Sequence, residues 1–196
     1  VSFEEMLELA GMGAGVMHSR SIEIGKRFGI PIYVRSSFDE KPGSWIYTDD
    51  QTPRRAVAGA ALLRNECRVT VFKVPDRPGT ARTIFSKIAR KNVAVDMIVQ
   101  NVADDGTTDI SFTVQKGDFP DTIAAAKAAS NEIGAGGIDF ENDVAKISVV
   151  GLGMAETPGV AAKMFQTLAD AGINILMITT SEIKVSVLVS QDDAAA

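Results

Sequence analysis

The feature that most constrains the fold of this chain is an internal repeat. Pro78-Gly79 recurs as Pro158-Gly159, a shift of 80 residues along the 196-residue sequence, and nine apolar positions after each turn recur at the same shift. Such self-similarity indicates that one structural unit is used twice. The matched pairs are Ala81 with Ala161, Ile84 with Met164, Phe85 with Phe165, Ile88 with Leu168, Ala89 with Ala169, Val93 with Ile173, Val95 with Ile175, Met97 with Met177 and Ile98 with Ile178.

Each repeat changes its hydrophobic period in the same order. A β-branched run favours a first strand, at 69–74 or 147–150. After the Pro-Gly turn, apolar residues fall at i, i+3, i+4 and i+7, which predicts one buried face of an amphipathic helix. Asn92 or Gly172 then stands where a left-handed residue ends the helix. Two further strands are expected, at 93–102 and 108–114 in the first repeat and at 173–179 and 183–189 in the second.

The first repeat continues beyond its third strand. An Ala-rich helix is predicted over 119–133, glycines follow it, and a short strand is expected at 138–140. This order is the βαββαβ ferredoxin-like arrangement. The second repeat stops after its third strand, without a closing helix and last strand, and we expect the run 57–63 to supply its missing edge.

Residues 1–47 differ from the repeats. Ser2 and Glu5 form a capping-box pattern that opens a helix through about Ala10, and a second helix over 19–28 and a strand over 30–35 are expected. These elements are too few to bury a core alone, so we interpret them as the C-terminal segment of a larger α/β domain. The predicted class is α+β, with that segment at 1–47, a linker and strand at 48–64, a complete repeat at 65–142 and an incomplete one at 143–196.

Composition excludes several classes of partner. The net charge is −5, from 20 Lys and Arg against 25 Asp and Glu, whereas nucleic-acid binders usually carry a basic surplus. The single cysteine, Cys67, excludes an internal disulfide and fits a reducing cytosol. Runs of apolar residues and glycine such as 56–63 are far shorter than the roughly 20 residues of a membrane helix. We therefore expect a cytoplasmic protein with no nucleic-acid or membrane partner, and its start at Val1 suggests a fragment or a processed product.

Nearly the whole chain also carries short segments in the order typical of one known family. These segments are SFEEMLELA at 2–10, HSRS at 18–21, IPIYVRSSF at 30–38, PG at 42–43, DRPG at 76–79, QNV at 100–102, DGTTDISF at 105–112 and TSEIKVSV at 180–187. Together they resemble the end of the catalytic domain of aspartate kinases (aspartokinases), followed by the paired regulatory ACT domains of that family.

The resemblance implies a parent enzyme that phosphorylates the side-chain carboxylate of aspartate with ATP, the first step toward lysine, threonine and methionine. The catalytic and ATP-binding motifs of the family lie upstream of Val1. We therefore expect no catalytic residue, no metal site and no cofactor in this chain, with ATP and Mg bound by the parent enzyme, and no kinase activity for the chain alone.

The ACT pair implies feedback inhibition by lysine, threonine or both. A free amino acid is a zwitterion; amide groups at a helix start suit its carboxylate, and an acidic side chain such as that of Asp76 suits its ammonium. Ala161 departs from a hydroxyl found in some relatives, which leaves the ligand of the second site open. Ala94 stands where a polar side chain is common, so a contact there is expected through the backbone. Carried over residue by residue, the effector-binding positions are Asp76, Gly79, Ala81, Ala94, Val95, Asp96 and Gln100 in the first repeat and Val160, Ala161, Asn174, Ile175 and Ser181 in the second.

Simpler roles compete for several of these residues. Asp76 is also placed to cap a helix. Gln100 is placed to satisfy polar groups at a strand end. Asn174 and Ser181 can equally have no dedicated role. His18 lacks a cluster of ligands at metal spacing, so we expect a structural role.

Two other functions remain as alternatives: the ACT sensor of another biosynthetic enzyme, and an RNA-binding ferredoxin-like module. ACT units pair edge to edge, so the expected partners are the effector and further chains, in a homo-oligomer or in a complex with a catalytic subunit.

Overall fold

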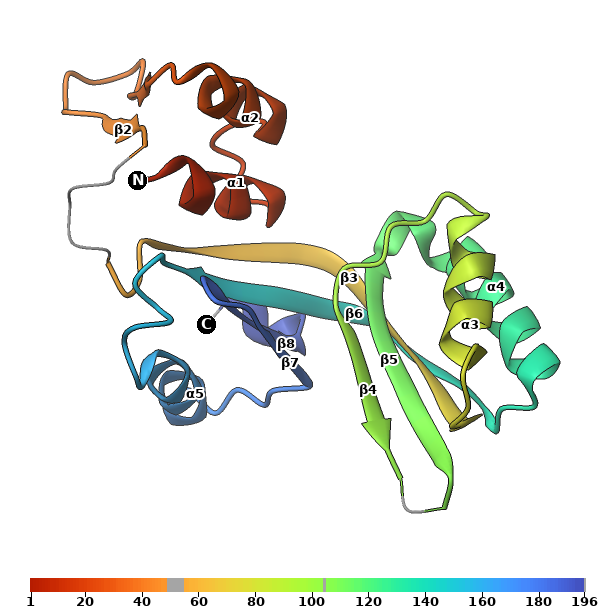
Figure 1. Ribbon diagram of the computed structural model, residues 1–196. Helices are drawn as coiled ribbons and strands as arrows, with labels where there is room; N and C mark the ends of the chain where they lie inside the picture. Colours follow the sequence, from red (N-terminus) through yellow and green to blue (C-terminus); the bar gives the residue numbers. More distant parts are fainter. Residues whose placement is uncertain (49–54, 104, 196) are drawn as a thin grey trace. The chain divides into compact units, whose positions relative to one another are not determined.

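The computed structural model describes residues 1–48, 55–103 and 105–195 (Figure 1). Contacts divide the chain into two compact units, each built around one repeat. The first-repeat unit comprises Arg64–Ala145 and Val189–Ala196, and the second-repeat unit comprises Val1–Leu63 and Lys146–Leu188. The boundaries predicted at 47, 64 and 142 stay predictions.

The first-repeat unit is a four-stranded antiparallel sheet with two helices on one face, the ferredoxin-like order that the sequence predicts (Figure 1). Its hydrogen-bonded strand order is β4-β5-β3-β6. The helix predicted over about 119–133 is confirmed. The elements in chain order are β3 (Gly59–Pro75, from Arg64 on), α3 (Thr80–Ala89), β4 (Ile98–Val102), β5 (Thr107–Gln115), the 3₁₀ turn η1 (Lys116–Asp118), α4 (Phe119–Ile133) and the first part of β6 (Gly137–Val150).

The core of this unit lies between the sheet and the two helices. Val69 of β3 pairs with Phe112 of β5, and both side chains are fully buried. The Phe112 ring meets that of Phe85 from α3 edge to face, with centroids 5.4 Å apart. Ala126 and Ala129 of α4 pack into the same core, where their small side chains let the helix lie close to the sheet.

The second-repeat unit has the strand order β3-β6-β8-β7 and one helix from the repeat. The Ala58 N–H donates to the Val150 carbonyl at 2.7 Å, so the prediction that 57–63 supplies an edge beside the second repeat is confirmed. Ser148 and Ser186, both buried, join their hydroxyls at 2.7 Å across β6 and β8. The elements are the start of β3, the end of β6, α5 (Val160–Asp170), β7 (Met177–Thr180) and β8 (Lys184–Ser190); the turn η2 (Asp192–Ala195) follows in the first-repeat unit.

The N-terminal segment packs within the second-repeat unit. It contains α1 (Phe3–Gly11), α2 (Ser19–Phe28) and the hairpin of β1 (Ile32–Val34) with β2 (Ser44–Ile46). The predicted capping box is confirmed, because Ser2 Oγ accepts from the Glu5 N–H at 3.1 Å and a Glu5 carboxylate oxygen accepts from the Ser2 N–H at 3.0 Å. The structural role expected for His18 is also confirmed: its Nδ1 caps α2 by accepting from the Arg20 N–H at 3.2 Å.

Several predicted strand boundaries are wrong. The strands expected from 93 and from 173 begin only at Ile98 and Met177. In the first repeat, the Met97 N–H bonds the side-chain hydroxyl of Thr113 instead of a strand carbonyl, which delays the start of β4. The separate strands expected at 57–63 and 69–74 are one strand, β3, and those at 138–140 and 147–150 are one strand, β6. The strand expected over 30–35 is limited to β1.

Within the described ranges, no helix is both long and apolar enough to cross a membrane. The same part of the chain holds no group of three His, Cys, Asp or Glu side chains that could ligate a metal ion.

Candidate functional site

Both repeats start their helix with the same backbone turn. Gly79 and Gly159 are the N-cap residues of α3 and α5, at φ +100° and +96°, a left-handed conformation that glycine adopts without strain. No side chain caps either helix, so the alternative of an Asp76 cap is wrong. The Asp76 N–H instead donates to the Gly106 carbonyl at 3.0 Å, and the Thr157 hydroxyl donates to the Gly153 carbonyl at 2.8 Å.

An uncapped helix start is suited to an anion. The first amide groups of a helix have no acceptor within the helix, and the helix dipole places partial positive charge there. A Cβ added to Gly79 or Gly159 would meet no atom within 4 Å, so each turn is open to an approaching group. The geometry therefore fits the carboxylate of an amino acid.

The structure places the predicted residues of the first repeat at opposite ends of α3. The helix-start set lies where β3 gives way to α3, and the other set follows the C-terminal end of the helix, where the Asp96 N–H donates to the Thr113 carbonyl at 3.1 Å. The 10 residues of α3, about 15 Å long, separate the sets. The helix-start set is Asp76, Gly79 and Ala81, and the helix-end set is Ala94, Val95 and Asp96. Gln100, exposed on β4 opposite Ile110, lies between them.

The second repeat has the same division. Val160 and Ala161 open α5, whereas Asn174 and Ile175 follow its C-terminal end. Ser181 follows β7 and donates its N–H to the Lys184 carbonyl at 2.8 Å. In neither repeat does a hollow described for this structure gather the predicted residues, and their roles in binding stay predictions.

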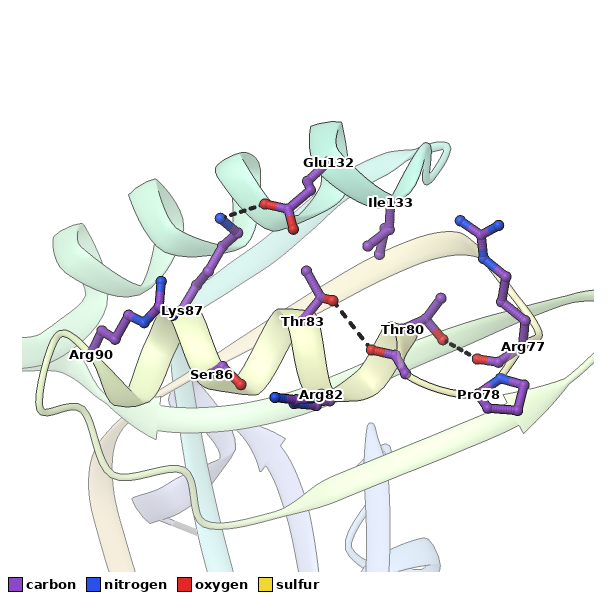
Figure 2. Close-up of a pocket in the computed structure, with 11 residues that line it drawn as sticks. Arg77, Pro78, Thr80, Arg82, Thr83, Ser86, Lys87, Arg90, Glu132 and Ile133 are labelled. Atoms are coloured by element: carbon purple, nitrogen blue, oxygen red, sulfur yellow. Dashed lines mark hydrogen bonds and ion pairs between the residues drawn. The ribbon is translucent and has the colours of Figure 1, made fainter.

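The turn of the first repeat opens on a polar hollow of about 690 Å³ along α3 (Figure 2). Of the predicted residues, only Gly79 lines it. Sequence reasoning missed the cationic side chains around this hollow, although the absence of acidic residues between Arg77 and Lys91 is visible in the sequence.

The turn of the second repeat opens on an apolar hollow of about 500 Å³, and here Val160 is the predicted residue in the lining. Ile147 and Val149 of β6 form one wall, and Met164 and Leu168 of α5 form another. In the first-repeat unit, two helices of the repeat, α3 and α4, cover the sheet. In the described part of the second repeat, α5 is the only α-helix. That difference leaves the half-buried side chains of β6 partly uncovered.

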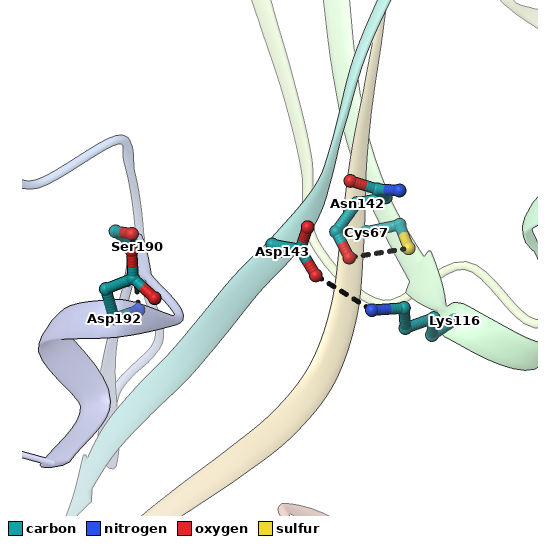
Figure 3. Close-up of polar contacts among 6 residues, drawn as sticks. All are labelled: Cys67, Lys116, Asn142, Asp143, Ser190 and Asp192. Atoms are coloured by element: carbon teal, nitrogen blue, oxygen red, sulfur yellow. Dashed lines mark hydrogen bonds and ion pairs between the residues drawn. The ribbon is translucent and has the colours of Figure 1, made fainter.

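Two charged groups at the ends of β5, Asp105 and Lys116, have shifted pKa values. At the turn between β4 and β5, the Thr107 hydroxyl and N–H donate to Asp105 Oδ1 at 2.6 and 3.0 Å, which lowers the pKa of that carboxyl. Beyond β5, a hydrogen bond from Lys116 to Asp143 at 2.8 Å raises the pKa of the Lys116 ammonium (Figure 3).

Cys67 lies in the core of the first-repeat unit. Its thiol contacts the Asn142 carbonyl at 3.7 Å, and burial raises its pKa (Figure 3). A buried thiol that holds its proton is a poor nucleophile. Cys67 therefore does not offer a reactive thiolate at either turn.

Comparison with known proteins gives consistent matches. Residues 68–131 and 147–196 match models of the ACT domain. The chain is 43% identical over 194 residues to an aspartokinase of Pseudomonas aeruginosa, covering 97% of the chain and 47% of that relative, so it spans about half of the relative's length.

Two solved structures match a smaller part of the chain. The structure of aspartokinase alpha and beta subunits is 51% identical, with a TM-score of 0.65, over 69% of this chain and 89% of that one. The ligand-free regulatory subunit of aspartate kinase from Thermus thermophilus is 39% identical, with a TM-score of 0.68, over 72% of this chain and 93% of that one.

Proposed function

We propose, from the premise that this chain belongs to the aspartokinase family, that it is the amino-acid-sensing region of an aspartate kinase. The observation that carries the proposal is the pair of uncapped, glycine-started helices, one in each ACT domain. The parent enzyme phosphorylates aspartate with ATP and Mg, and the effector is lysine, threonine or both. The chain by itself has no kinase activity.

The coverage of the relatives supports a kinase origin for the N-terminal segment. The Thermus regulatory subunit aligns with 72% of this chain, whereas the Pseudomonas aspartokinase aligns with 97%. The ACT-domain models match residues 68–131 and 147–196, so residues 1–47 lie outside both ACT domains. We assign residues 1–47 to the end of the kinase domain on this ground.

The division of the predicted residues supports an effector seat between two chains. β4 is the last strand of its unit and has a neighbour on one side only. Antiparallel pairing of β4 with the same strand of a second copy places Ile98 of one chain beside residue 102 of the other. The helix-start set of one copy then faces the helix-end set of its partner, with Gln100 near the two-fold axis. β7 offers the same edge in the second repeat.

Both seats offer amide groups to the ligand carboxylate, and the first seat also offers a partner to its ammonium. The amide groups at the start of α3 or α5 receive the carboxylate, and in the first repeat Asp76, exposed beside the turn, receives the ammonium. Binding at such an interface favours whichever arrangement of chains completes the seat, which is the requirement for feedback control.

Isothermal titration calorimetry with lysine and threonine, together with sedimentation, tests the proposal. We expect at least one amino acid to bind to a dimer or larger assembly, and Asp76→Asn to weaken binding about tenfold by removing a charge-assisted hydrogen bond. Asp121→Asn is the matched control, because Asp121 is an exposed α4 carboxylate paired with Lys91 at 3.1 Å. If neither amino acid binds an assembled sample at millimolar concentration, or if a monomer binds tightly, the proposal fails.

A further inference from the structure

The outer surface of α3 carries a concentration of positive charge that amino-acid sensing does not require. From Arg77 to Lys91 the chain has five cationic side chains and no acidic one, although the chain as a whole has 25 acidic residues against 20 basic ones. The five are Arg77, Arg82, Lys87, Arg90 and Lys91.

The neighbouring helix neutralises only the two lysines. Lys87 pairs with Glu132 at 2.7 Å and Lys91 pairs with Asp121 at 3.1 Å, both carboxylates belonging to α4. The three arginines have no ion-pair partner among the residues that the structure describes.

The arginines stand around a hollow rather than on a flat surface. The hollow of about 690 Å³ is lined by Arg77, Arg82 and Arg90, and Thr83 and Ser86 lie between them on the outward face of α3 (Figure 2). The Thr83 hydroxyl donates back to the Gly79 carbonyl at 3.2 Å, which keeps this side chain against the helix. Small residues between long cationic ones thus make room for a ligand, and the start of α3 adds its partial positive charge at one end.

The second repeat lacks this arrangement. At the 80-residue shift, Ala162 replaces Arg82 and Asp170 replaces Arg90, and the corresponding segment has Lys163 as its one cation. The hollow beside α5 is apolar. The charge is therefore not a property of the ACT fold, since the same helix exists without it.

We propose that the hollow on α3 binds a small phosphate-bearing molecule. Guanidinium groups present planar pairs of N–H donors that match phosphate oxygens, and several of them around one hollow favour a multivalent anion over a single carboxylate. The size of the hollow and the net negative charge of the chain favour a small ligand over a nucleic acid. The site shares Gly79 and the start of α3 with the proposed effector seat, whereas Arg82 and Arg90 are not among the predicted effector residues.

Titration of the full chain with inorganic pyrophosphate tests the proposal, followed by calorimetry and by backbone amide NMR shifts. We expect saturable binding, shifts concentrated in residues 77–90, and at least about a tenfold loss of affinity in Arg82→Gln/Arg90→Gln. Lys163→Gln on α5 is the matched control and is expected to leave the affinity unchanged. Circular dichroism of the variants checks that these exposed substitutions leave the fold intact.

Three results would overturn the proposal. The first is no binding of pyrophosphate at millimolar concentration, and the second is an affinity in the double variant equal to that of the parent chain. Citrate binding as tightly as pyrophosphate would exclude selectivity for phosphate. Lysine and threonine titrations of the same variants keep this outcome separate from the sensing function, because neither substitution touches the predicted effector residues.

Discussion

The two repeats share a backbone and differ in the side chains around it. Gly79 and Gly159 adopt nearly the same φ, both helices lack a side-chain cap, and both edge strands begin later than the hydrophobic pattern predicts. Yet one turn opens on arginines and the other on aliphatic side chains. The comparison teaches that the glycine turn and the apolar helix face specify the fold, while the outward positions of the helix are free to specify a ligand.

The largest expected effect concerns the two cores. Phe112 pairs with Ile98 in the first repeat, and Val187 pairs with Ile178 at the equivalent place in the second. The side chains of Phe112 and Val187 are both fully buried. Phe112→Ala should lower the free energy of unfolding by about 3–5 kcal/mol, and Val187→Ala by about 2 kcal/mol, because the cost follows the apolar volume removed.

Urea denaturation followed by circular dichroism measures both losses. Phe72→Ala, on an exposed aromatic of β3, serves as the control and should cost far less. Equal losses of unfolding free energy in Phe112→Ala and Val187→Ala would contradict the expectation that the cost follows the apolar volume removed.

A second prediction concerns the Glu5 carboxylate, which joins the start of α1 to the loop after β6. Glu5 is buried; one carboxylate oxygen accepts from the Ser2 N–H and the other accepts from the Leu152 N–H at 3.0 Å. Glu5→Ala leaves both donors unsatisfied and should cost about 2–3 kcal/mol in the free energy of unfolding. Glu8→Ala removes a partly exposed ion pair with Lys184 and should cost less than about 1 kcal/mol. Hydrogen exchange at Leu152 reports the difference, and unchanged protection in Glu5→Ala would contradict it.

A third prediction tests whether the two turns are equivalent. Gly79→Ala and Gly159→Ala each place a Cβ in open space but in a left-handed conformation, so each should cost about 1–2 kcal/mol for the backbone alone. The two losses should agree closely in urea denaturation. A much larger cost at one turn would show that its glycine also serves close packing.

The smallest expected effect is a local dependence on pH in the first repeat. The hydrogen bonds from Thr107 keep the pKa of Asp105 below its usual range, so they support the β4–β5 turn above the pKa of the unfolded chain and are lost as pH falls through the folded value. The Thr107 amide signal should therefore titrate at lower pH than that of an ordinary aspartate neighbour. Asp105→Asn should abolish the titration, and a midpoint in the usual aspartate range would contradict the bond.

Local signals in the sequence predict most elements of this fold. The capping box of Ser2 and Glu5, the left-handed Gly29 and the Ala-rich stretch of α4 each define a helix boundary by short-range chemistry. The lengths of β3 and β6 are not predictable in this way. Polar segments join their apolar halves, and Arg68 is stabilised by Glu141 at 3.2 Å, a contact between distant residues that hydrophobic periodicity does not reveal.

The candidate site was predicted only in part for a related reason. The glycine turns follow from the repeat, because the same two residues recur at the same place. The separation of Gly79 from Asp96 follows from the path of the chain, since α3 runs back along the sheet before β4 begins. Sequence spacing alone does not show at which end of the helix each group lies.

The buried carboxylate of Glu5 has a mechanical consequence. One rigid side chain holds the first turn of α1 with one oxygen and the loop after β6 with the other, joining segments that are distant in the sequence. If residues 151–159 shift, the carboxylate must either release that loop or turn with it and free the Ser2 amide, which would loosen the first turn of α1. The start of α1 and the loop after β6 are thus coupled, and the strength of the coupling is set by the two hydrogen bonds that one carboxylate accepts.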